Sequence, residues 1–238
     1  SLYNCADKII FECQPALKDL MNSLDKNIVI RSPKDPIVEA DYHIPLLSLP
    51  MINDTKLETI PSAVPYLRSD QDLAQIWQNK FDEQRPKVGL VWSGNSKRQD
   101  DWMRSCPAEF LHSILDVEGC HFVSLQKEGV PQSLAPLHDL SSELTDFSQT
   151  AAAIMALDLV ITVDTAVAHL AGALGKPVWV MLGYTADWRY LLKREDSPWY
   201  PTMRLRRQTK PGDWDGLTIK LASELKKWIL VECPQGEI

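Results

Sequence analysis

From residue 87 onward, short apolar runs alternate with segments whose apolar positions recur at helical spacing. The runs KVGLVW (87–92), HFVSLQ (121–126), DLVITVD (158–164) and PVWVML (177–182) predict strands. Most of these runs are apolar almost throughout, as strands covered on both faces must be. Because helical segments separate them, the pattern predicts βαβ units and a parallel sheet.

The helical segments have recognisable starts and ends. Pro107 can occupy the first turn of a helix, and Asp146 fits an N-cap position. Gly175 stands where a helix C′ glycine belongs, and Pro177 follows it. The predicted helices are PAEFLHSIL (107–115), DFSQTAAAIMAL (146–157), TAVAHLAGAL (165–174) and a last segment at about 214–229.

The first part of the chain is less regular. DKIIFECQ (7–14) and NIVIRS (27–32) predict strands on either side of a helix, and a proline-rich stretch follows. The segment SDQDLAQIWQNKFDEQ (69–84) predicts a helix that joins a small first lobe (1–85) to a second domain (86–238). Its apolar face is formed by Leu73, Ile76, Trp77 and Phe81.

Composition and charge argue against several classes of protein. Hydrophobic residues make up 45% and charged residues 24% of the chain, as in ordinary globular domains. No apolar run approaches the roughly 18 residues of a membrane-spanning helix, so at most peripheral membrane contact is expected. The net charge of −7 disfavours nucleic-acid binding. The basic cluster RLRRQ (204–208) fits a solvated strand end and an anion contact equally well.

The cysteines argue against a zinc site and against a disulfide framework. Their number, 5, is odd, and no pair has CxxC spacing, so free thiols in a reducing cytoplasm are expected. Cys106 has no histidine close in sequence, which disfavours a nucleophilic role. The cysteines are Cys5, Cys13, Cys106, Cys120 and Cys233.

The junction VDTAVAH (163–169) is the first candidate site. In parallel α/β sheets, ligands bind beyond the carboxyl ends of the strands, at helix N-termini. Asp164 ends a predicted strand and Thr165 opens a helix, whose free N–H groups suit a diphosphate. Ala166 allows close approach, and His169 falls opposite the packed stripe of the helix. The spacing fits equally well a plain N-cap at Asp164 and a surface position for His169.

Two further loops follow predicted strands. WSGNSKRQDDWMRS (92–105) carries donors such as Arg104 that can neutralise phosphate oxygens, although a solvated loop fits it better. SLQKEG (124–129) would direct Gln126 and Lys127 over the same sheet edge, although a plain turn also fits. No GxGxxG motif is present, so no dinucleotide cofactor is expected.

Several stretches resemble one family in the same order along the chain. DLVITVDTAVAHLAGALGKPVWVML (158–182) and DWRYLLKREDSPWYPTMRLRRQ (187–208) resemble the C-terminal glycosyltransferase region of bacterial tetratricopeptide-repeat proteins. That region is related to the lipopolysaccharide heptosyltransferases of glycosyltransferase family 9. KVGLVWSGN, FVSLQKEG and DFSQTAAAIMALD fit the same family. The resemblance implies an α/β fold of the GT-B kind, with a Rossmann-like C-terminal domain that holds a nucleotide-sugar donor and a smaller, incomplete N-terminal lobe.

The resemblance also implies the residues of the donor site. It assigns catalytic roles to His169, Arg104 and Lys127, and it implies neither a metal nor a cofactor. The donor-binding residues that it implies are Ser93, Gly94, Asn95, Gln126, Asp146, Thr150, Asp164, Thr165 and Ala166.

Two features of the family are missing from this sequence. It has no tetratricopeptide repeats, and it starts after the point at which the family has a glycine-rich loop with Gly-Asp. In the heptosyltransferases that loop is associated with the catalytic base. We therefore expect the base to be absent from the chain or supplied by a residue that the sequence does not identify.

Three functions fit these observations. The first is a metal-independent, inverting glycosyltransferase, or a fragment of one, that uses an ADP- or UDP-linked sugar. The second is a non-catalytic nucleotide- or partner-binding module derived from such an enzyme. The third is a sugar-nucleotide epimerase, for which the first lobe offers only scattered acid–base candidates such as Asp41 and His43.

Overall fold

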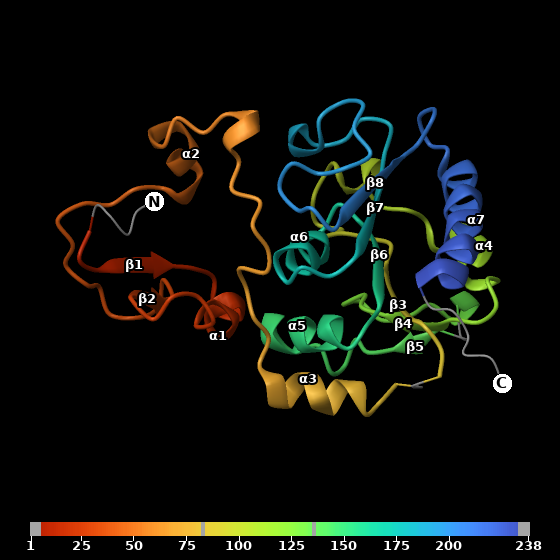
Figure 1. Cartoon of the computed structure of the whole chain (residues 1–238), viewed down its shortest axis with the longest axis horizontal. Helices are drawn as coiled ribbons and strands as arrows, with labels where there is room; N and C mark the ends of the chain where they lie inside the picture. The colour runs from red at the N-terminus through yellow and green to blue at the C-terminus, as the bar shows by residue number, and fades with distance from the viewer. Residues whose placement is uncertain (1–5, 82–83, 135–136, 233–238) are drawn as a thin grey trace.

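The computed structural model describes residues 6–81, 84–134 and 137–232. Its largest element is a parallel sheet of six strands in the order β5-β4-β3-β6-β7-β8, with helices on both sides (Figure 1). The predicted α/β fold with a parallel sheet is therefore confirmed. The strands are β3 (Lys87–Val91), β4 (His121–Ser124), β5 (His138–Asp139), β6 (Leu159–Val163), β7 (Val178–Leu182) and β8 (Met203–Arg207).

The strand order creates a switch point at the centre of the sheet. Renumbered from β3 along the chain, the strands lie in the order 3-2-1-4-5-6, which is that of doubly wound nucleotide-binding folds. The chain moves outward from β3 to β5 on one side and from β6 to β8 on the other. Such folds bind ligands between the carboxyl ends of the two central strands, here β3 and β6.

Two hydrophobic clusters fill the two faces of the sheet. Val88 and Leu90 of β3 belong to one cluster, and their neighbour Val91 belongs to the other, as the alternation of strand side chains requires. All residues of β6 and β7 are buried, which agrees with the continuous apolar runs of the sequence. The helices of the first cluster are α4 (His112–Leu115) and α7 (Trp214–Glu232), and those of the second include α3 (Gln71–Gln78), α5 (Phe147–Met155) and α6 (Ala166–Ala173).

The N-terminal region, residues 6–70, projects to one side of α5 and α6 (Figure 1). In it, β1 (Ile9–Glu12) pairs in parallel with β2 (Ile28–Arg31), and α1 (Lys18–Met21) lies between them in sequence. Leu20 of α1 is only 3% exposed and joins the hydrophobic cluster around α5. The region is therefore anchored to the larger sheet through α1.

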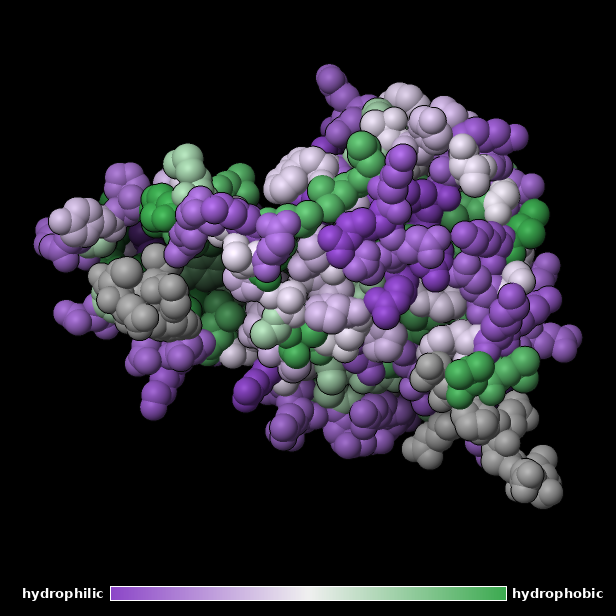
Figure 2. Space-filling view, turned by 45° about the horizontal axis from the view of Figure 1, so that its top comes forward, coloured by the Kyte–Doolittle hydropathy of each residue, from purple (hydrophilic) through white to green (hydrophobic). Residues whose placement is uncertain are grey.

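The rest of the N-terminal region leaves many apolar side chains open to solvent. Around the short helix α2 (Leu49–Ile52), Leu47 is 93% exposed and Met51 is 78% exposed. Figure 2 shows apolar surface on the projecting N-terminal part, whereas the visible face of the sheet domain is mostly polar. This region buries much less of its apolar surface than the six-stranded sheet does.

The helix predicted for 69–84 is shorter than expected. It spans Gln71–Gln78, and Asp70 caps it by accepting a hydrogen bond from the Leu73 N–H. Trp77 is buried as expected, but Ile76 is 53% exposed, so the prediction of its place on the buried face was wrong. Phe81 lies beyond the helix and is still buried. Residues 82 and 83 lie outside the described residues.

Other boundaries also differ in detail. The segment after Pro107 begins as a 3-10 turn, Ala108–Leu111, before α4 continues it. RLRRQ forms most of the edge strand β8, and the last helix extends to Glu232. Within the part of the chain that the structure describes, no helix has the length and apolar character needed to cross a membrane.

Candidate functional site

Two loops meet at the carboxyl ends of β3 and β6. The loop after β3 folds through a 3-10 turn, Asp101–Met103, which brings Arg104 toward the end of β6. The Arg104 Nη1 atom donates to the carbonyl oxygen of Asp164 at 3.3 Å, although the two residues are 60 positions apart. The sequence-predicted Arg104 and Asp164 are thus brought together at the switch point.

The first turn of α6 is open to a ligand. Thr165 is its N-cap in an extended conformation, and its side chain makes no capping hydrogen bond. Its hydroxyl instead lies 3.1 Å from that of Thr162, while Ala166 is exposed. The first backbone N–H groups of a helix have no partner within the helix, and together with the helix dipole they favour an anion. Because Thr165 is the N-cap of α6, the alternative in which Asp164 is only the N-cap is wrong.

The Asp164 carboxylate points into a small group of aromatic side chains. The Tyr190 hydroxyl donates to Asp164 Oδ1 at 2.7 Å, and His169 Nε2 lies 3.9 Å from the same oxygen. The His169 Nδ1 atom lies 3.3 Å from the Tyr200 hydroxyl. Tyr190 and His169 therefore both lie near one oxygen of Asp164, and Tyr200 lies near the other ring nitrogen of His169.

His169 is partly covered rather than fully exposed. Its side chain is 31% accessible, and its ring stacks against that of Tyr190 at an interplanar angle of 15°. Burial is the main factor that lowers the pKa of His169, and the charge of Arg189 acts in the same direction. The imidazole is accordingly neutral at pH 7, with one ring nitrogen free of a proton.

Gly94 makes room for Arg104 in the β3 loop. A Cβ atom at this position would lie 2.5 Å from Asp101 Oδ1 and 2.7 Å from Arg104 Nη2. Asp101 is buried and accepts from Arg104 Nε at 3.0 Å and from the Ser105 hydroxyl at 2.7 Å. The Gly94 N–H donates to the same Ser105 hydroxyl, so this loop is closed around the guanidinium.

Gln126 supports the β3 loop from the next strand. The side chain is only 3% exposed, and its Oε1 atom accepts from the Ser93 N–H at 3.1 Å. Its Nε2 atom donates to the Ser93 hydroxyl at 2.8 Å. Gln126 therefore fixes the start of the loop instead of extending over the sheet edge. Asn95 lies further along the loop, is exposed, and accepts from the Lys97 N–H.

Lys127, Asp146 and Thr150 lie on the β4 side of the sheet. Lys127 Nζ donates to the Leu144 carbonyl at 2.7 Å. Asp146 caps α5 by accepting from the Gln149 N–H, and the Thr150 hydroxyl donates to the Asp146 carbonyl. These residues hold the start of α5 in place, and their roles toward a donor remain predictions.

The sequence did not single out Tyr190, Tyr200 or Asp101. Tyr190 and Tyr200 lie inside the segment 187–208 that carries the family resemblance, and this resemblance could have indicated them as site residues. The position of Asp101, three residues before Arg104, was a second signal, since this spacing permits a local ion pair.

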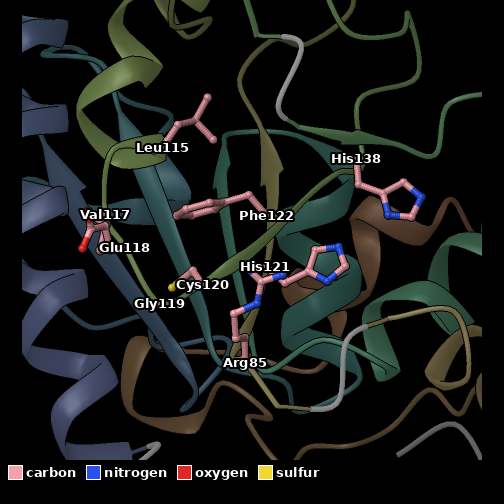
Figure 3. A pocket seen from close by; sticks show the side chains of 9 residues that line it. All are labelled: Arg85, Leu115, Val117, Glu118, Gly119, Cys120, His121, Phe122 and His138. Carbon is pink, nitrogen blue, oxygen red and sulfur yellow. The ribbon is translucent and has the colours of Figure 1, made fainter.

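A pocket also lies at the opposite edge of the sheet. A pocket of about 510 Å³ is formed by residues before β3, by the segment between α4 and β4, and by the first residues of β4 and β5 (Figure 3). In it the rings of His121 and His138 stack with centroids 5.7 Å apart. Ligands of doubly wound sheets bind at the carboxyl edge, so this pocket does not mark the expected site.

Cys106 follows the β3 loop and is 1% exposed. Burial raises the pKa of its thiol to about 12, so the thiol stays protonated and unreactive at neutral pH. Cys13 and Cys120 are also buried, and Cys5 and Cys233 lie outside the described residues. In the ranges that the structure describes, no three His, Cys, Asp or Glu side chains are grouped to hold a metal ion.

Known proteins share sequence with the part of the chain that contains these loops. The sequence model of glycosyltransferase family 9 (heptosyltransferase) matches residues 55–191, which include both switch-point loops. Protein FlbA of Caulobacter vibrioides is 27% identical over 190 residues, which cover 75% of this chain and 31% of that protein. This chain therefore spans only about a third of FlbA.

One solved structure has a similar fold, and a second is similar to a lesser degree. The ADP-heptose lipopolysaccharide heptosyltransferase II of E. coli has a TM-score of 0.52 at 19% identity, over 73% of this chain and 56% of that one. A glycosyl transferase family 9 structure from Veillonella parvula DSM 2008 has a TM-score of 0.49 at 15% identity, with the same coverage. Because the family match spans more than half of the sequence, the chain belongs to glycosyltransferase family 9.

Proposed function

We propose that the chain binds the donor of a metal-independent, inverting glycosyl transfer. The donor is a nucleotide-diphosphate sugar, ADP- or UDP-linked, and its diphosphate binds at the first turn of α6. The observation that carries this proposal is the hydrogen bond from Arg104 to the Asp164 carbonyl. It holds a cation beside an open helix N-terminus, and both features favour a dianionic group.

In this proposal the site stabilises the leaving group. An acceptor hydroxyl attacks the anomeric carbon from the face opposite the diphosphate, the bond to the diphosphate oxygen breaks, and the hydroxyl proton passes to a base. The charge that develops on the diphosphate is met by the first N–H groups of α6 and by Arg104. His169 orients the donor or the leaving group. Lys127 would contribute by exchanging the Leu144 carbonyl for a phosphate oxygen.

The proposal divides the chain between donor and acceptor. Residues 86–238 form the nucleotide-sugar domain, and residues 1–85 form a partial lobe on the acceptor side that includes the linker helix. The exposed apolar side chains of the N-terminal region support a lobe that is completed by further contacts. Buried free thiols support a reducing, cytoplasmic location. Membership of family 9 supports transfer of a hexosyl or heptosyl group.

Calorimetric titration of ADP and UDP into the whole chain tests the binding step. We expect Arg104→Gln to weaken binding about 10- to 100-fold, because a hydrogen bond to a charged group contributes about 1.5–3 kcal/mol. The matched control is Arg204→Gln, since Arg204 lies at the exposed amino end of β8 and bonds to Pro201 and Met203 carbonyls. Equal affinity in wild type and Arg104→Gln would remove Arg104 from the site.

Incubation with ADP- and UDP-linked sugars tests the transfer step. Release of free nucleotide diphosphate, with or without an added glycan acceptor, is the expected result for a glycosyltransferase. Nucleotide binding without release would favour the non-catalytic binding module instead. Absence of binding to either nucleotide in the wild type would overturn the proposal.

A further inference from the structure

Tyr190 holds one oxygen of the Asp164 carboxylate. It is 1% exposed, and its hydroxyl donates to Asp164 Oδ1 at 2.7 Å. Burial first, and the neighbouring Asp164 charge second, raise the pKa of Tyr190 far above its ordinary value. The hydroxyl therefore keeps its proton, and the contact is a hydrogen bond from a neutral donor to a carboxylate, which is among the stronger kinds.

The backbone at Tyr190 is fixed from another strand. Arg207 of β8 donates through Nη2 to the Tyr190 carbonyl at 2.5 Å and to the Leu191 carbonyl at 2.8 Å. Leu191 has φ 55° and ψ −166°, which side chains with a Cβ rarely adopt. Such a conformation persists only where the surroundings hold it, and Arg207 holds both of its flanking carbonyl groups.

One oxygen atom thus faces two candidate donors. His169 Nε2 lies 3.9 Å from Asp164 Oδ1, beyond hydrogen-bond distance, while Tyr190 occupies that oxygen. The stacked rings of His169 and Tyr190 have centroids 6.3 Å apart, so both side chains approach Asp164 from the same side. Removal of the tyrosine hydroxyl would leave the oxygen open to an imidazolium.

The charges around His169 come from two elements. Asp164 lies at the end of β6, and Asp187 and Arg189 lie at the 3-10 turn Trp188–Tyr190, where they form an ion pair. Both carboxylates raise the pKa of His169, whereas burial and Arg189 lower it and prevail. The hydroxyl groups of Tyr190 and Tyr200 complete the polar surroundings.

We propose that Tyr190, fixed by Arg207, is a positioning residue: its hydrogen bond to Asp164 Oδ1 draws on the charge of that carboxylate and weakens the pairing of Asp164 with a protonated His169, whose Nε2 lies 3.9 Å from the same oxygen. His169 then meets the donor as a neutral imidazole that can accept or donate one hydrogen bond. The contacts are properties of the chain itself. Only the identity of the ligand that His169 meets rests on the proposed function.

Nuclear magnetic resonance titration of His169 tests the proposal without any ligand. In Tyr190→Phe, we expect the measured pKa of His169 to rise by about one pH unit, because a carboxylate without that hydrogen bond pairs more strongly with the imidazolium. The matched control is Tyr184→Phe, which removes one hydroxyl from a 57% exposed tyrosine in the same loop after β7. The control should titrate as the wild type does.

A second variant, at Arg207, changes the support of the Tyr190 backbone without altering Tyr190 or Asp164. Arg207→Lys keeps a positive charge, but its side chain is one bond shorter, so its ammonium does not reach the position that Nη2 occupies between the two carbonyl groups. We expect the pKa of His169 to rise in the same direction as in Tyr190→Phe and by a smaller amount. Thermal unfolding of each variant identifies any that fail to fold. An unchanged His169 titration in folded Tyr190→Phe would overturn the proposal.

Nucleotide titration separates this inference from the proposed function. If ADP binds, its affinity in Tyr190→Phe should change with pH around a higher midpoint than in wild type, because His169 charges at higher pH. If ADP and UDP do not bind to any form, the proposed function fails. The His169 titration would still decide whether Tyr190 positions Asp164.

Discussion

The two edges of the six-stranded sheet differ in what their charged groups do. At the carboxyl edge, Arg104 crosses from the β3 loop to the end of β6, and Tyr190 crosses from the β7 loop to Asp164. At the amino edge, Lys87 pairs with Asp158 at the start of the neighbouring strand, and Lys176 donates to the Met155 carbonyl. Contacts at the first edge join the loops of the candidate site, and those at the second connect the ends of neighbouring elements.

Helix polarity explains why the pockets of the amino edge are poor sites for an anionic ligand. The amino edge carries the pocket of about 510 Å³ and a second of about 320 Å³ that includes Lys87 and Lys176. Helices present their C-termini there, and the negative end of the helix dipole repels a phosphate. At the carboxyl edge the dipole has the opposite sign. For an anionic ligand, the direction of the helices therefore matters more than the volume of the hollow.

A glycine at each edge gives the largest expected difference. We expect Gly94→Ala to weaken nucleotide-diphosphate binding about 10- to 100-fold, because the new Cβ displaces the Arg104 guanidinium. Gly119 at the amino edge has φ +86° and open space around its Cβ position, so Gly119→Ala should cost about 1 kcal/mol of unfolding free energy without changing affinity. Calorimetry and thermal unfolding measure both effects.

A protein that carries both Gly94→Ala and Arg104→Gln tests whether the two changes act on the same contact. Gly94→Ala should have no further effect on affinity in an Arg104→Gln background, because both changes act on one guanidinium. Additive losses would mean that Gly94 acts through a different contact.

The first turn of α6 permits a smaller and more specific change. Ala166 is the first helical residue, and proline is tolerated at that position because its N–H has no partner within the helix. Thr165 before it has φ −135° and ψ 173°, which is compatible with a following proline. Ala166→Pro should therefore weaken diphosphate binding about 5- to 20-fold with little change in melting temperature. Ala166→Ser keeps the N–H and should bind nearly as the wild type does.

The sequence predicted the centre of the sheet better than its edges. The strands β3, β6 and β7 are apolar on both faces, so their runs were visible without any tertiary information. The two-residue strand β5 is too short to form a pattern. The edge strand β8 alternates Met and Leu with arginines. From the sequence, these arginines fitted a solvated strand end as well as an anion contact.

The site was predictable where it lies at strand ends and not where it depends on distant loops. The rule that ligands bind beyond the carboxyl ends of parallel strands indicated Asp164 as a candidate, whereas Arg104 came from the family resemblance, because a solvated loop fitted its segment better. Tyr190 lies in an irregular loop, and only the folded chain brings its hydroxyl to Asp164. Gln126 was expected over the sheet edge, but its side chain turns back to satisfy the N–H and hydroxyl groups of Ser93.

His169 gives a pH dependence that is specific to the carboxyl edge. Its pKa in the folded chain is below the ordinary value of 6.5, so the unfolded chain binds more protons between these two values. Stability should therefore fall as the pH is lowered through 6.5 toward the folded pKa. His169→Gln should flatten this part of the stability profile, as urea unfolding at several pH values would show. An identical slope in both proteins would contradict the lowered pKa.

The amino-edge pocket gives the smallest expected effect. His138→Ala removes one of the two stacked rings of the pocket, and His138 is exposed at the start of β5. We expect ADP and UDP affinity to change less than about twofold, because the substitution lies at the edge where helix C-termini disfavour phosphate. The Gly94→Ala protein serves as the positive control in the same titration. A loss of binding in His138→Ala would place the ligand at the amino edge and reverse the comparison between the two edges.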